Sequence, residues 1–103
     1  MYIQLILSCT DKTEADKIAQ VLLEKRSIAC AKQLPVSSNF VWKGQVDHSE
    51  EILLVMDSRE DLFDEIEAEV KKLHSYETFV LQAVPIIKVS KDAEVWLKET
   101  LIG

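Results

Sequence analysis

A Lys43-Gly44 pair separates two long stretches of extended, β-prone sequence. Gly44 is the only glycine before the last residue, and glycine readily adopts the left-handed conformation that a tight reversal requires. Residues 28–42 read as extended before the pair, and residues 46–56 return as a strand after it, which predicts a long two-stranded hairpin. Pro35 cannot donate a ladder hydrogen bond, so we expect a bulge, a bend or a sheet edge there.

The rest of the chain alternates strand and helix patterns. Residues 2–9 are apolar and β-prone, and we expect a short strand buried on both faces. Residues 78–84 predict another strand, which ends at a proline. Three helices are predicted to begin at Asp11, Ser58 and Ser90, the first with a glutamate at capping-box spacing. Their apolar stripes have helical spacing: Ala15, Ile18, Ala19 and Leu22; Leu62, Phe63, Ile66, Val70 and Leu73; Ala93, Trp96, Leu97 and Leu101.

The order of these elements is β-α-β-β-α-β with a C-terminal helix, in a single domain over residues 1–103. This order predicts an α+β fold, a ferredoxin-like sandwich with helices on one face of an antiparallel sheet. The hairpin is longer than a sheet of roughly 6-residue strands can cover. Exposed strand edges are normally covered or used for assembly. Because Phe40 and Trp42 lie on this edge, we expect the chain to assemble with copies of itself.

Composition narrows the class of partner. There are 12 Lys and Arg against 18 Asp and Glu, a net charge of −6, which argues against nucleic acid and against anionic membrane surfaces but is compatible with cations. No apolar run is long enough to span a bilayer. The first residues lack the basic region of a signal peptide, so we expect a cytoplasmic protein. Cys9 and Cys30 lack the spacing of a redox or zinc pair and are expected to be reduced thiols.

Five segments occur in the order and spacing of a known family. They are Arg26-Ser27-Ile28-Ala29-Cys30, Ser38 to Gly44, Glu51-Ile52-Leu53-Leu54-Val55, Leu73-His74-Ser75-Tyr76-Glu77 and Val95-Trp96-Leu97. Through them the chain resembles, over nearly its whole length, the CutA family of small trimeric proteins named for divalent-cation tolerance. The resemblance implies the ferredoxin-like fold, a homotrimer held by extended β arms, and cation binding of the copper type as the proposed activity.

The chain departs from the family's usual residues at several polar positions. A proline usually follows the histidine, a Pro-Glu pair lies two residues beyond the glutamate, an asparagine lies two residues after the cysteine, and a Lys-Thr pair ends the third strand. These departures bear on ligand binding more than on the fold. In this chain the corresponding residues are Ser75, Phe79 with Val80, Lys32, and Asp57 with Ser58.

Cys30, His74 and Glu77 are the candidate metal ligands. Cu²⁺ or Zn²⁺ prefers thiolate and imidazole donors, with a carboxylate as a third. The family resemblance includes Cys30 and the segment from His74 to Glu77. His74 and Glu77 are three residues apart, where we expect a helix to end and a strand to begin. Tyr76 and Lys32 are further candidates for binding, although Lys32 would lie on the same strand face as Cys30 and repel a cation. A buried thiol and a histidine that satisfies helix-end carbonyls are the structural alternatives.

Catalysis is not expected, because no serine or cysteine nucleophile lies in a recognisable catalytic context. Two other functions remain open. One is a trimeric signalling module that binds a small anionic ligand between subunits, which would need Lys32, Lys43 and Lys88 to converge. The other is a structural or partner-binding trimer in which any metal is incidental.

Overall fold

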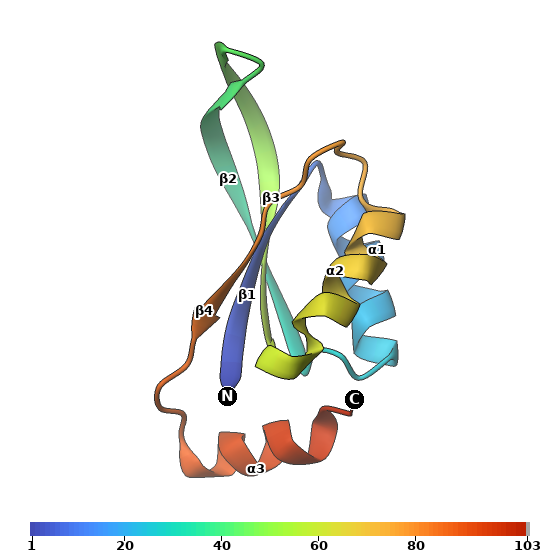
Figure 1. The fold of residues 1–103 in the computed structure, drawn as a ribbon, viewed down its shortest axis with the longest axis vertical. Coiled ribbons are helices and arrows are strands. Elements are labelled where there is room, and N and C mark those ends of the chain that lie inside the picture. Colours follow the sequence, from blue (N-terminus) through green and yellow to red (C-terminus); the bar gives the residue numbers. More distant parts are fainter. Residues whose placement is uncertain (103) are drawn as a thin grey trace.

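The computed structural model describes residues 1–102 and has the predicted element order. Its four strands form one antiparallel sheet in the order β2-β3-β1-β4, with α1 and α2 on one face and α3 across the lower end (Figure 1). This arrangement confirms the ferredoxin-like α+β fold. No helix among the described residues has both the length and the apolar character needed to cross a membrane. The elements are β1 (Tyr2–Cys9), α1 (Lys12–Glu24), β2 (Cys30–Trp42), β3 (Gln45–Arg59), the 3₁₀ turn η1 (Glu60–Leu62), α2 (Phe63–Leu73), β4 (Leu81–Pro85) and α3 (Lys91–Thr100).

The core lies between the sheet and the helices α1 and α2. Successive side chains of a strand point to opposite faces, and alternate residues of β1 are accordingly buried beneath the helices. The intervening residues Gln4, Ile6 and Ser8 are only partly buried, so the expectation that this strand is buried on both faces is wrong for the single chain. The core includes Ile3, Leu5, Leu7 and Cys9 of β1, Ile18 and Leu22 of α1, Leu54 and Met56 of β3, and Ile66 and Val70 of α2.

The opposite face of the sheet, called here the open sheet face, has no helix packed on it among residues 1–102 (Figure 1). Residues paired across antiparallel strands share a face, so the register identifies its members. Leu34 and Val84 are each 43% exposed, a large fraction for apolar side chains inside a sheet. This face is a candidate contact surface. Its apolar members are Ile6, Leu34, Val36, Leu53, Val55 and Val84.

The predicted hairpin is present and extends well beyond the sheet (Figure 1). β1 pairs with β3 only as far as Cys9 opposite Ile52, so residues 36–51 form a two-stranded projection, called here the arm. Lys43 and Gly44 close the arm with φ of 52° and 80°, the left-handed pair typical of a two-residue hairpin turn. Pro35 lies in β2, which is an edge strand with an unbroken register, so the sheet-edge alternative is the correct one.

The predicted starts of the second helix and of the last strand differ from the structure. Ser58 does not cap a helix: it lies in β3, is fully buried, and its hydroxyl donates a hydrogen bond to the carbonyl of Ser27 at 2.6 Å. The alternation of buried residues continues through Ser58, so its small side chain fits beneath the helices and α2 begins later, after a 3₁₀ turn. The last strand begins at Leu81 rather than at residue 78, because Phe79 stacks on the ring of His74, with 5.4 Å between ring centroids. Ser90 does precede α3, as predicted, although its side chain makes no capping hydrogen bond.

Ser58→Ala and Ser90→Ala should therefore have very different effects on stability. The first removes the hydroxyl that satisfies a buried carbonyl and should lower the free energy of unfolding by about 1–3 kcal/mol. The second removes no hydrogen bond and should change it by less than about 0.5 kcal/mol. Urea unfolding followed by circular dichroism measures both. A loss for Ser58→Ala no larger than that for Ser90→Ala would contradict the role given to the Ser58 hydroxyl.

Candidate metal site

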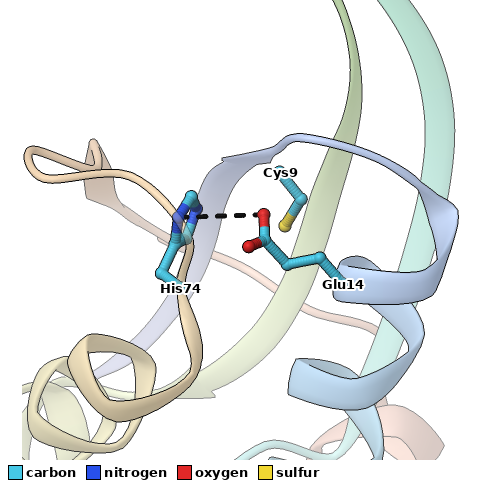
Figure 2. Close-up of side chains that lie close together, drawn as sticks. All are labelled: Cys9, Glu14 and His74. Carbon is cyan, nitrogen blue, oxygen red and sulfur yellow. Dashed lines mark ion pairs between the residues drawn. The ribbon is translucent and has the colours of Figure 1, made fainter.

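The end of β1, the start of α1 and the segment that follows α2 meet at one place. Figure 2 shows Cys9, Glu14 and His74 pointing toward one another from these three segments. Their potential ligand atoms lie within 4.8 Å of one another. Cys9 is buried, the His74 side chain has no exposed surface and that of Glu14 is 9% exposed. A thiol, an imidazole and a carboxylate are thus gathered away from bulk water.

His74 is held by hydrogen bonds at both ring nitrogens. Its Nδ1 lies 3.1 Å from the backbone N–H of Tyr76, which can only donate, so Nδ1 accepts. Its Nε2 lies 2.8 Å from the carbonyl oxygen of Ser8, which can only accept, so Nε2 carries the proton. Tyr76 and Phe79 flank the ring, with centroids at 4.7 and 5.4 Å. These contacts define the orientation of the ring and its tautomer, with the proton on Nε2.

Glu14 connects the start of α1 to the segment after α2. Its backbone N–H donates to Asp11 Oδ1 at 2.9 Å, so Asp11 caps α1 as predicted. Its carboxylate accepts from the backbone N–H groups of Thr10 at 2.8 Å and Ser75 at 2.6 Å, and lies 3.7 Å from His74 Nδ1. Burial raises the pKa of Glu14, but these hydrogen bonds outweigh it and the net pKa is lowered. Glu14 is therefore an ionised carboxylate at neutral pH.

Cys9 is a protonated thiol in this setting. Burial, followed by the negative charges of Glu14, Glu51 and Asp11, raises its pKa to about 12. A metal ion that binds here must displace the thiol proton. Cys9 is part of the hydrophobic core, but it also lies beside two other potential ligands.

The predicted ligand Cys30 lies elsewhere. On β3, Cys9 pairs with Ile52 and Cys30 pairs with Asp57. These two partners are five positions apart, which corresponds to about 17 Å along the strand. Cys30 is on the open sheet face, whereas Cys9 faces the helices, and the Cys30 Sγ lies 3.5 Å from Lys32 Nζ. The predicted set of Cys30, His74 and Glu77 therefore does not come together within one chain. The strand register places Cys9 rather than Cys30 beside the histidine of the same chain.

Two of the other predicted residues lie close to His74. Tyr76 donates its hydroxyl to Glu51 Oε2 at 2.5 Å, and burial together with this carboxylate raises the pKa of Tyr76 to about 12. Glu77 is exposed beside the same segment. Lys32 remains with Cys30 on the open sheet face. The sequence did contain a signal for Glu14, since its capping-box spacing from Asp11 fixes it next to the end of the first strand.

The sequence profile of the CutA1 divalent ion tolerance protein family matches residues 3–100. The chain belongs to this family. A relative named divalent-cation tolerance protein CutA, from Archaeoglobus fulgidus, is 38% identical over 88 residues, 85% of this chain and 86% of that one. The protein of the same name from Thermus thermophilus is 30% identical over 95 residues, 91% and 92% of the two chains.

Solved structures of CutA proteins have the same fold. A structure described as the periplasmic divalent cation tolerance protein CutA from Archaeoglobus fulgidus superposes with a TM-score of 0.94 at 34% identity, covering 97% of this chain and 98% of that one. That of the divalent cation tolerance protein from Thermus thermophilus gives 0.95 at 28% identity, covering 98% and 99%. The family resemblance and the fold predicted from the sequence are both confirmed.

A hollow of about 890 Å³ lies between the arm and residues 75–80 of this CutA1 chain. Three carboxylates line it, and the described lining residues include no lysine or arginine. The lysines that an anionic ligand would need are spread over the chain: Lys32 is on the open sheet face, Lys43 at the turn of the arm and Lys88 between β4 and α3. They do not converge within one chain. The carboxylates are those of Asp47, Glu51 and Glu77.

Glu14→Gln should lower stability in a pH-dependent way. The folded-state pKa of Glu14 is lowered from 4.5, so its carboxylate contributes stability that is present above that pH and is lost as the pH falls through the folded value. At pH 7 the variant should be less stable by about 1–3 kcal/mol, and the difference from wild type should shrink below about pH 4.5. Urea unfolding at pH 7, 5 and 3.5 tests this, with the exposed Glu67→Gln as control. A difference that does not change with pH would show that the charge of Glu14 is unimportant.

Proposed function

We propose that this CutA1 protein is a non-catalytic protein that takes up a borderline divalent cation, Zn²⁺ or Cu²⁺, at Cys9, Glu14 and His74. The observation that carries the proposal is the approach of a thiol, a carboxylate and an imidazole to within 4.8 Å. These are the donor types that such cations prefer. The curated relatives named for divalent-cation tolerance support the same class of ligand.

The tautomer of His74 also favours metal binding. Nδ1 is the nitrogen that faces Glu14, at 3.7 Å, while Nε2 donates to the Ser8 carbonyl. Histidines that bind metals usually donate their other ring N–H to a carbonyl or carboxylate, which fixes the ring orientation. Nδ1 is thus the donor atom available to a cation, once the N–H of Tyr76 has moved away from it.

Affinity should be moderate rather than high. The cation must displace a thiol proton whose pKa is about 12 and replace the hydrogen bond between Nδ1 and Tyr76. Mg²⁺, which prefers oxygen ligands and strict octahedral geometry, has little to gain from a site with one carboxylate. Selectivity should therefore favour Cu²⁺ over Zn²⁺ and exclude Mg²⁺.

The chain offers matched controls for this site, because it has two cysteines and two histidines. Calorimetric titration with Zn²⁺, with thiols kept reduced, should show binding that Cys9→Ala or His74→Ala weakens by at least about tenfold. Cys30→Ala and His48→Ala should leave the binding unchanged. Because one thiol proton is released, the apparent Kd should fall about tenfold per unit between pH 7 and 8.5. Circular dichroism verifies that each variant is folded.

The reverse pattern, loss with Cys30→Ala and none with Cys9→Ala, would contradict the proposed ligands and favour a site that needs Cys30. Absence of Zn²⁺ and Cu²⁺ binding in the wild type would contradict metal uptake altogether. The remaining function would then be that of a structural or partner-binding protein.

We infer, second, that the protein assembles as a homotrimer. The arm exposes Phe40 and Trp42 at 39% each, Val41 at 71% and Val46 at 81%. Within the part of the chain that the structure describes, residues 45–51 of β3 have no strand on the side where β1 pairs with the rest of β3. Their N–H and C=O groups on that side form a free pairing edge. Free edges and the apolar open sheet face are both surfaces that subunit contacts cover.

Native mass spectrometry at micromolar concentration should show a trimer as the dominant species. The assembly should bury well over about 2,000 Å² in total, the size class of obligate contacts. Replacing Trp42 and Val46 together with serine should reduce the trimer population, because both side chains lie on the exposed arm. A dominant species at the monomer mass of 11.8 kDa in the wild type would refute the trimer.

The cytoplasm remains the predicted compartment. Cys9 and Cys30 are free thiols on strands that β3 separates, which suits a reducing environment. The relative from Archaeoglobus fulgidus is described as periplasmic, so the two compartments are real alternatives for this family. Cell fractionation distinguishes them.

A further inference from the structure

Two groups compete for one lone pair at His74. Nδ1 accepts the backbone N–H of Tyr76 at 3.1 Å, and the same nitrogen faces Glu14 at 3.7 Å. A neutral imidazole has one unprotonated nitrogen, and here the Nε2 proton is already committed to Ser8. A cation at Nδ1 and the N–H of Tyr76 therefore cannot both be bound to His74.

Tyr76 is held at both its ends. Its backbone N–H is bound to His74, and its hydroxyl donates to Glu51 Oε2 at 2.5 Å. The two rings also contact each other, with centroids 4.7 Å apart. Moving the Tyr76 backbone away from Nδ1 must therefore strain or break the hydrogen bond to Glu51.

Glu51 lies at the root of the arm. The last residue pair between β1 and β3 is Cys9 with Ile52, so Glu51 is the first residue of β3 beyond the cover of β1. Glu51 is only 8% exposed, and Tyr76 is the sole hydrogen-bond partner of its side chain among the described residues. The Tyr76–Glu51 contact is thus a direct connection between the segment after His74 and the arm.

We propose that Tyr76 is a latch that couples cation uptake at His74 to the root of the arm. This inference rests on the proposed function and adds its regulation. In the latched state, Tyr76 occupies Nδ1 and fixes Glu51. In the loaded state, the cation takes Nδ1 and Tyr76 leaves Glu51, which frees the arm from residues 74–80.

Such coupling is reciprocal. When only a fraction of a protein is in the state that can bind a ligand, the apparent Kd equals the intrinsic Kd divided by that fraction. Weakening the latch without touching a ligand should therefore tighten cation binding, and filling the site should weaken the latch by the same factor. A purely structural role of Tyr76 predicts the opposite, since loosening the segment would disorder His74 and weaken binding.

Tyr76→Phe is the deciding variant, because it keeps the ring beside His74 and removes only the hydroxyl bound to Glu51. Zn²⁺ titration should give a Kd lower than wild type by roughly three- to tenfold, the effect of removing one competing hydrogen bond. Tyr2→Phe, which changes the only other tyrosine in the chain, is the control and should leave the Kd unchanged. An unchanged or higher Kd for Tyr76→Phe would overturn the latch.

Amide hydrogen exchange gives a second measurement on the wild-type protein. Saturation with Zn²⁺ should accelerate exchange at the backbone N–H of Tyr76, because the cation takes its acceptor. Slower or unchanged exchange there would overturn the latch. If the wild type binds Zn²⁺ through Cys9 and His74 but Tyr76→Phe has no effect, only the latch fails. If the wild type binds no Zn²⁺, the proposed function fails together with it.

Discussion

The mismatch in length between β1 and the hairpin governs this structure. β1 has 8 residues, whereas β2 and β3 have 13 and 15, so β1 ends while its neighbours continue. At that point the chain turns into α1, the segment after α2 crosses over, and the arm begins without a third strand. The donor cluster, the buried Glu51 and the free edge of β3 all lie there. A longer β1 would cover the edge and leave no room for the three segments to meet.

The chemistry of the cluster depends on how its groups are already satisfied. The Glu14 carboxylate accepts hydrogen bonds from two backbone N–H groups, and both ring nitrogens of His74 have hydrogen-bond partners. The Cys9 thiol retains its proton. These bonds stabilise the junction when no cation is bound. A cation at the proposed site would therefore compete with bonds that hold the fold together, and the difference between the two sets of interactions would decide its affinity. For that reason the presence of suitable donor types does not by itself imply tight binding.

Much of the fold could be read from the sequence, because its signals are local. The Asp11 cap, the Lys43-Gly44 turn and the buried stripe of α1 each involve residues within a few positions, and all three were confirmed. The stripe predicted for the last helix was wrong at Trp96, which is 45% exposed. The prediction that Ser58 caps a helix was wrong, because a serine before a helical pattern can equally lie at the end of a strand. Only the packing beneath the helices decides between the two positions. The predicted metal ligands stay a prediction, and Cys30 lies apart from His74 within one chain for a longer-range reason. Choosing between Cys9 and Cys30 as the neighbour of His74 requires the strand register and the face of each residue, which composition and spacing do not contain.

In the proposed trimer, the position of the cluster would also link ligand binding to assembly. Glu51 belongs to the arm through its backbone and to the junction through Tyr76. A neighbouring subunit that packs on the arm would restrict the same residues that must move when a cation reaches Nδ1. The energy of subunit contact and the energy of cation uptake are then not independent, because both act on one hydrogen bond at the root of the arm. Affinities measured on an isolated chain would differ from those of the assembled protein even if the three ligands were identical in both.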